Sequence, residues 1–192
     1  MVKAYFIQYK FILPESTKHS SYAYQKLFRA LYGYTQKVTK SNGKEYSYYR
    51  DGILSNIPFI RTGKNCILIS PQNFQFLISY FKTGKNPAHA WKEKGDWKAV
   101  YYMSEKEMSI SDVVKSIDSL IDRSYISPSH HDEQNLLVNE IKKNSEKALK
   151  DPVYKSIITN KVNQIVSHEW FKTAPDQSAK AKEVYSLYQQ LK

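Results

Sequence analysis

Basic and aromatic residues alternate between residues 36 and 64, and this combination of side chains can bind a nucleic acid. Lysine and arginine neutralise phosphates, and tyrosine rings accept stacked bases without requiring a given base sequence. On a strand, Tyr46 and Tyr48 share one face, so rings can be presented there while the neighbouring turn presents amines. The residues of this segment expected to bind nucleic acid are Lys37, Lys40, Lys44, Tyr46, Tyr48, Arg50, Arg61 and Lys64.

A second basic and aromatic segment, residues 83–98, contains two tryptophans in an otherwise polar stretch. Trp97 opens a predicted strand, which makes it the better candidate for anchoring the loop to the core. Trp91 is the better candidate for clamping a base or a ribose. We therefore add Lys85 and Trp91 to the residues expected to bind nucleic acid.

Patterns that would support catalysis or cofactor binding are sparse. Residues 130–133 read His-His-Asp-Glu, but adjacent side chains point apart, whereas two ligands on one helical face are three or four positions apart. Lys64 and Lys85 each follow a glycine without the full glycine-rich pattern of a phosphate loop. Cys66 is the only cysteine, which excludes an internal disulfide and a cysteine-based zinc cage, and we interpret it as a core residue. We expect no catalytic residue, no metal site and no cofactor.

The positive charge is concentrated in the first part of the chain. The formal net charge is +11; residues 1–103 contain 16 basic and 5 acidic residues, whereas residues 104–192 contain 13 of each. Of the 27 aromatic residues, 21 lie in residues 1–103. A polyanion with stackable bases uses both properties, whereas a membrane surface or an acidic protein needs mainly the charge. The charge pattern therefore predicts a basic domain, residues 1–103, that binds RNA or single-stranded DNA, and a neutral helical region, residues 104–192.

Other interpretations of the same residues stay open. The tyrosines can pack beneath helices while the lysines only keep the sheet soluble. A nuclease or a modification enzyme can assemble its site from dispersed residues, for which Asp51 and His89 are candidates. A ribosome-associated or viral assembly protein would use a basic face to meet structured RNA.

The sequence also bears on location and partners. No apolar run approaches the roughly 18 to 20 residues that a membrane span requires, and the first residues lack the layout of a signal peptide. We expect a soluble cytoplasmic protein with no membrane partner. The C-terminal helices carry mixed glutamate and lysine surfaces, which favour a small bundle that forms a homodimer or binds a protein partner.

The elements that must position the candidate residues predict an α+β fold. Strands are expected at residues 2–13, 34–40, 45–50, 57–61, 66–70 and 97–103. In the first strand the odd-numbered residues from 5 to 13 are apolar or aromatic and should face a core. Ser20 or Ser21 caps a helix that ends at Gly33, and Pro71 begins a second helix. We expect these two helices to pack on a mostly antiparallel sheet.

Beyond residue 103 the periodicity indicates helices only. The expected segments are residues 111–121, 131–150, 152–166 and 176–191. Each carries apolar residues at spacings of three and four, which is typical of an amphipathic helix. A bundle of three or four helices should therefore follow the N-terminal domain.

Overall fold

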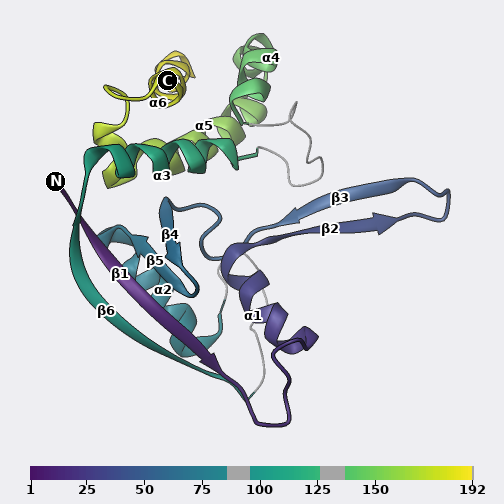
Figure 1. The fold of residues 1–192 in the computed structure, drawn as a ribbon. Coiled ribbons are helices and arrows are strands. Elements are labelled where there is room, and N and C mark those ends of the chain that lie inside the picture. The colour runs from purple at the N-terminus through teal and green to yellow at the C-terminus, as the bar shows by residue number, and fades with distance from the viewer. Residues whose placement is uncertain (86–95, 126–136, 192) are drawn as a thin grey trace. The chain divides into compact units, whose positions relative to one another are not determined.

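The structure is a computed structural model that describes residues 1–85, 96–125 and 137–191. It confirms the predicted α+β class, with an antiparallel sheet and two helices first and further helices afterwards (Figure 1). By contacts between residues, the chain divides into two compact units. Unit 1 consists of Met1–Tyr34 and Asp51–Ser109, and unit 2 consists of Thr35–Arg50 and Ile110–Lys192. The predicted division between residues 103 and 104 rests on composition and stays a prediction.

Unit 1 is built on a four-stranded antiparallel sheet with the strand order β4-β5-β1-β6. Its strands are β1 (Val2–Ile12), β4 (Phe59–Gly63), β5 (Cys66–Ile69) and β6 (Lys98–Met108). β1 pairs with β6 over its whole length, from Val2 opposite Met108 to Ile12 opposite Lys98. Its pairing with β5 ends at Gln8, which lies opposite Cys66. The C-terminal end of β1 therefore extends past the β4–β5 hairpin.

The sixth strand is longer than its apolar residues predict. The sequence indicated residues 97–103, whereas β6 continues to Met108. Residues 104–108 are mostly polar, but they pair with the first half of β1, from Phe6 opposite Ser104 to Val2 opposite Met108. The backbone hydrogen bonds of a long partner strand therefore extend β6 where side-chain alternation gives no signal.

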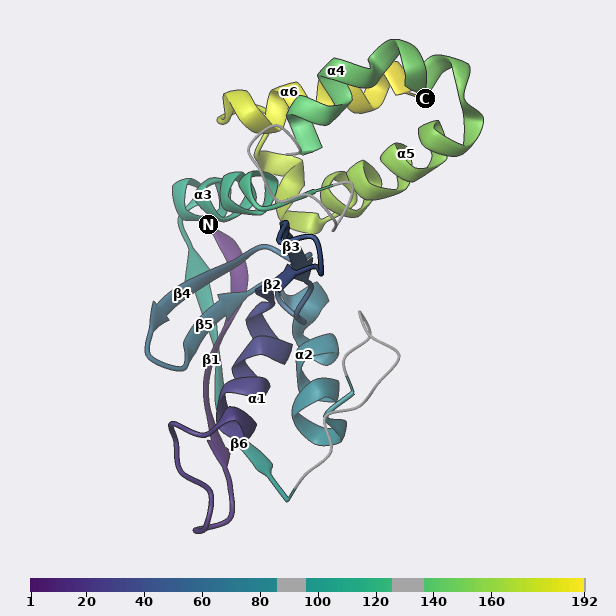
Figure 2. The ribbon, with the colours of Figure 1, turned by 90° about the vertical axis from the view of Figure 1, so that its right-hand side faces the viewer.

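The predicted inward face of β1 is confirmed. Ile7, Tyr9 and Phe11 are buried, and Gln8 and Lys10 are exposed on the opposite face. The buried face is covered by α1 (Tyr22–Tyr32) and α2 (Pro71–Thr83), which lie on the same side of the sheet in Figure 2. Among the described residues, no helix of unit 1 lies on the other face of the sheet, where Gln8 and Lys10 are exposed.

Aromatic rings fill the space between the sheet and the two helices. The Phe11 ring meets the Phe28 ring edge to face at 5.3 Å and the Trp97 ring at 5.6 Å. The buried Tyr80 hydroxyl donates a hydrogen bond to the Leu27 carbonyl at 3.0 Å, which ties α2 to α1. Trp97 thus packs against the core, as expected for the residue that anchors its loop.

The segment that follows the first hairpin closes the C-terminal end of α1. The backbone N–H of Ile53 donates to the Ala30 carbonyl at 2.9 Å, and that of Leu54 donates to the Leu31 carbonyl at 2.8 Å. These carbonyls belong to the last turn of α1, where no partner within the helix exists. The contact brings Gly52 directly against the backbone of Leu31 and Gly33.

Unit 2 combines a separate two-stranded hairpin with the C-terminal helices. The hairpin consists of β2 (Tyr34–Thr39) and β3 (Glu45–Arg50), as predicted. The helices are α3 (Ile110–Asp122), α4 (Leu137–Lys150), α5 (Pro152–Val166) and α6 (Ala179–Leu191). Residues 131–136, predicted as the start of the second of these, lie outside the described residues. None of the described helices is long and apolar enough to cross a bilayer.

A short 3-10 helix, η2 (Glu169–Thr173), was not predicted from the sequence. Trp170 and Phe171 within it are buried, and the Nδ1 atom of buried His168 accepts the backbone N–H of Trp170 at 3.3 Å. Two adjacent apolar residues show neither helical nor strand periodicity, so their packing is visible only in the folded unit.

Acid is expected to destabilise unit 2 through His168. Burial lowers the pKa of His168 to about 4, from an ordinary value of about 6.5. Between these values the unfolded chain binds a proton that the folded chain does not, so stability falls as the pH falls through this window. We expect a loss of about 2 kcal/mol between pH 7.5 and pH 5 from this residue.

Urea denaturation of the intact protein and of His168→Gln at both pH values measures this effect. The substitution should remove the His168 contribution, so the variant should lose about 2 kcal/mol less stability on acidification. An equal loss in both proteins would contradict the assignment to His168.

Candidate nucleic-acid-binding surfaces

The tip of the β2–β3 hairpin has the turn that its Asn-Gly pair predicts. Gly43 has φ 76°, and its N–H donates to the Lys40 carbonyl at 2.9 Å. The Lys40 N–H donates to the Lys44 carbonyl at 3.0 Å, and the Asn42 side chain accepts the Lys44 N–H at 3.1 Å. The turn therefore places the two lysines opposite each other at the end of the hairpin.

One face of the hairpin brings rings and cations together. Because side chains alternate along a strand, Lys40, Tyr46, Tyr48 and Arg50 lie on this face. The Lys40 ammonium lies 4.3 Å from the centre of the Tyr46 ring, and the Arg50 Nε donates to the Gln36 side chain at 3.2 Å. Both tyrosines are partly exposed, and both cations are exposed. This surface, which we call the Tyr46 face, can neutralise phosphates beside rings that can stack on bases.

The opposite face of the hairpin differs in character. Lys37 lies there and is exposed, so it does not join Lys40 on the Tyr46 face. Tyr49 is partly buried on that same face and lies close enough to Arg123 to raise the pKa of the guanidinium slightly, against the larger effect of burial. Burial lowers the pKa of Arg123 to about 10, which leaves it charged at neutral pH. Tyr49 therefore packs within unit 2. Lys37 can contact phosphates only on the face of the hairpin opposite the Tyr46 face.

The remaining predicted residues lie in unit 1 or outside the described residues. The Arg61 guanidinium lies over the Tyr32 ring at 5.3 Å. Lys85 is exposed just after α2. Lys64 occupies the β4–β5 turn, and Trp91 lies outside the described residues. Of the ten predicted residues, six therefore lie on the hairpin and three in unit 1.

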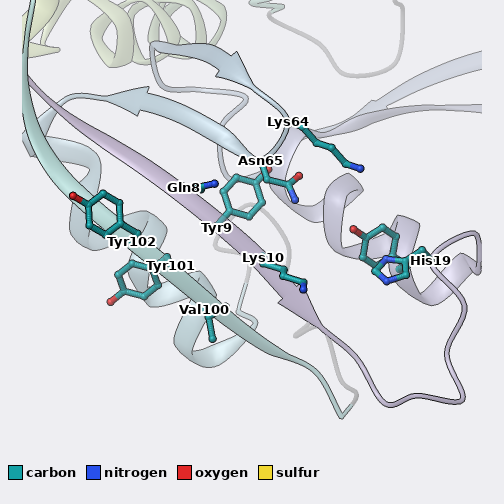
Figure 3. A pocket seen from close by; sticks show the side chains of 10 residues that line it. Gln8, Tyr9, Lys10, His19, Lys64, Asn65, Val100, Tyr101 and Tyr102 are labelled. Atoms are coloured by element: carbon teal, nitrogen blue, oxygen red, sulfur yellow. The ribbon is translucent and has the colours of Figure 1, made fainter.

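A groove of about 560 Å³ lies on unit 1 where β1 extends past β5 (Figure 3). Gln8 and Lys10 project into it from the exposed face of β1. Across the sheet, Tyr102 lies opposite Gln8 and Val100 lies opposite Lys10, so all four share one face. Two side chains of β1 thus form its floor, and two of β6 form one wall.

The other wall comes from two segments that are distant in sequence. The β4–β5 turn contributes Lys64 and Asn65, and the Asn65 carbonyl accepts the Tyr9 N–H at 2.9 Å. His19 and Tyr24 line the groove beyond this turn, with their rings edge to face at 4.6 Å. Ser21 accepts the Tyr24 N–H and so caps α1 at this point.

The groove carries positive charge on its floor and on the wall that lies away from β6. Lys10 and Lys64 line it together with the His19 imidazole, and none of the described lining residues is Asp or Glu. A second hollow on the sheet mixes its charges, because Lys3 and Lys106 line it together with Glu105 and Glu107. The first groove is therefore the better site for an anion.

Tyr9 lies beneath this groove and is structural. Its hydroxyl shares a 2.8 Å hydrogen bond with the Tyr32 hydroxyl. Burial raises the pKa of Tyr9 well above its ordinary value, and the bond to Tyr32 adds to the shift. Tyr9 therefore stays protonated at neutral pH and does not supply a base.

Sequence reasoning found Lys64 but missed the other main groove residues, Lys10, His19, Tyr24 and Tyr102. A signal existed in β1, where polar Gln8 and Lys10 interrupt the otherwise hydrophobic outward face of the strand. His19 and Tyr102 carried no such signal, because only the packing of α1 and the register of β6 bring them to the groove.

No metal site is built from the described residues, since no group of three or more His, Cys, Asp and Glu side chains comes together among them. The His-His-Asp-Glu run at residues 130–133 and the candidate His89 lie outside the described residues. Cys66, expected in the core, is partly exposed on the face of the sheet that carries Gln8.

Comparison of the chain with family models, with curated proteins and with solved structures found no match.

Proposed function

We propose that this protein binds unpaired nucleic acid, either RNA or single-stranded DNA, through exposed basic and aromatic surfaces. The observation that carries the proposal is the Tyr46 face of the hairpin. There, Lys40 lies over Tyr46, with Tyr48 and Arg50 further along the same strand. Cations of this kind bind phosphates, and the rings beside them stack on bases.

The contacts of the cations support this proposal. Three lysines on the C-terminal helices are paired with carboxylates: Lys115 with Asp112 at 3.7 Å, Lys142 with Glu183 at 2.5 Å and Lys180 with Asp122 at 2.7 Å. The bond to Asp122 raises the pKa of Lys180. On the hairpin, by contrast, Lys40 contacts a ring, and the part of the chain that the structure describes contains no ion pair between Lys40 and a carboxylate. A phosphate can bind such a charge without first displacing a carboxylate.

The rings favour unpaired strands over a duplex. A tyrosine contacts the flat face of a base, and in a duplex that face is covered by the neighbouring base pairs. On β3, Tyr46 and Tyr48 are two positions apart, which corresponds to roughly 6.6 Å along a strand. Each ring can therefore accept a different base of one extended strand.

Binding of an oligonucleotide is expected to weaken steeply with salt. Each phosphate neutralised on a single strand contributes about −0.7 to the slope of log K against log salt. The four hairpin cations, with Lys37 on the opposite face included, therefore contribute about −3 to the slope, which alone corresponds to roughly 50-fold weaker binding at 200 mM than at 50 mM salt.

The binding affinity and its dependence on salt can be measured by fluorescence anisotropy with labelled single-stranded and duplex RNA and DNA at the two salt concentrations. Single strands should bind more tightly than duplexes of the same length. A flat response to salt, or no binding at 50 mM, would overturn the proposal.

A further inference from the structure

The groove of unit 1 has an aromatic and apolar side and a polar, basic side. Figure 3 shows Tyr102 and Val100 on the β6 side of β1, and Lys64, Asn65 and His19 on the other side. A ligand lying across β1 thus meets an aromatic ring at one end and nitrogen donors at the other.

The ring of Tyr102 is exposed although it stands in the middle of a long strand. Its exposed fraction is 62%, and the neighbouring Val100 on the same face is 48% exposed. An exposed ring on a sheet face is a stacking platform for a planar group. Tyr102 therefore offers its surface to a ligand rather than to the core.

Amide groups lie between the ring and the cations. Gln8 stands directly opposite Tyr102, and Asn65 lines the groove from the β4–β5 turn. Each amide has one acceptor oxygen and two donor hydrogens, the complement of the polar edge of a nucleobase. The volume of about 560 Å³ lies within the range of about 300 to 1,000 Å³ typical of small-molecule sites.

From these features we infer that the groove binds one unpaired nucleotide of the strand, with its base on Tyr102 and a phosphate between Lys10, Lys64 and His19. The inference rests on the proposed function and assigns it a site in unit 1. The groove contains both an apolar platform and amide groups, so it can distinguish a nucleotide that carries a base from one that lacks it.

The test combines Tyr102→Ala with a single abasic position moved along a single-stranded oligonucleotide. In the intact protein, loss of the base at the groove should weaken binding between about 5-fold and 150-fold. In Tyr102→Ala the same abasic position should have little further effect, because the stacking partner is already gone.

Matched controls separate the groove from general damage. Phe76→Ala removes an exposed ring from α2, and Lys82→Gln removes an exposed cation from the same helix. Both should leave oligonucleotide binding unchanged. Lys64→Gln should weaken binding and make the salt slope shallower by about 0.7.

The outcomes distinguish this inference from the proposed function. Suppose that the intact protein binds oligonucleotides, but the abasic position weakens binding by the same factor in Tyr102→Ala as in the intact protein. The groove assignment is then wrong, and nucleic-acid binding by this protein stands. If the intact protein binds no oligonucleotide, both are overturned. Weakening by Phe76→Ala as strong as that by Tyr102→Ala would also overturn the assignment.

Discussion

Replacing the four cations of the hairpin with glutamine is expected to weaken binding of a single-stranded oligonucleotide roughly 10²- to 10³-fold at 0.1 M salt. The substitutions are Lys37→Gln, Lys40→Gln, Lys44→Gln and Arg50→Gln. All four side chains are exposed, so their loss should leave the fold intact. The salt slope should become shallower by about 2.8, because each lost phosphate contact removes about 0.7.

The control for this variant has the same net charge. It replaces four exposed lysines outside the hairpin and the groove: Lys82, Lys150, Lys172 and Lys182. Oligonucleotide titrations of both variants, with thermal melts to verify folding, make the comparison. Equal weakening in the two would mean that only total charge matters and would contradict a role for the hairpin surface.

Gly52→Ala is expected to destabilise unit 1 by about 4 kcal/mol or more. A Cβ atom at this position would lie 2.7 Å from both the carbonyl carbon and the carbonyl oxygen of Leu31, and it would also meet the Gly33 nitrogen. All three atoms are backbone, so no side chain can rotate away to relieve the clash. The segment would have to leave the end of α1 and lose the hydrogen bonds of Ile53 and Leu54.

Gly63→Ala is the matched control for this substitution. The nearest atom to its added Cβ would be the Cβ of Cys66 at 3.8 Å, an ordinary van der Waals distance. Chemical denaturation of both variants measures the difference. A Gly52→Ala protein as stable as Gly63→Ala would show that the Gly52 segment does not pack against α1 as described.

Much of the local structure could be predicted because each signal depends on neighbouring residues. Alternation in β1 identifies its buried face, Ser21 and Gly33 bound α1, and Asn42-Gly43 marks the hairpin turn. The placement of Tyr46 and Tyr48 on one face follows from the same two-residue period.

The groove could not be predicted in the same way. Lys10, His19, Lys64 and Tyr102 lie on four segments of the chain, and no spacing in sequence relates them. They meet because β1 pairs with β6 in one register and because the β4–β5 turn lies beside Tyr9. Strand order and register depend on contacts between distant residues, which a period of two does not specify.

The sequence by itself determined the α+β class, the inward face of β1 and the separation of charge between the two parts of the chain. Only the tertiary structure decided the order β4-β5-β1-β6 and which cations become neighbours. The physical reason is that periodicity and capping act over a few residues, whereas neighbours across a sheet are chosen by the packing of the whole unit.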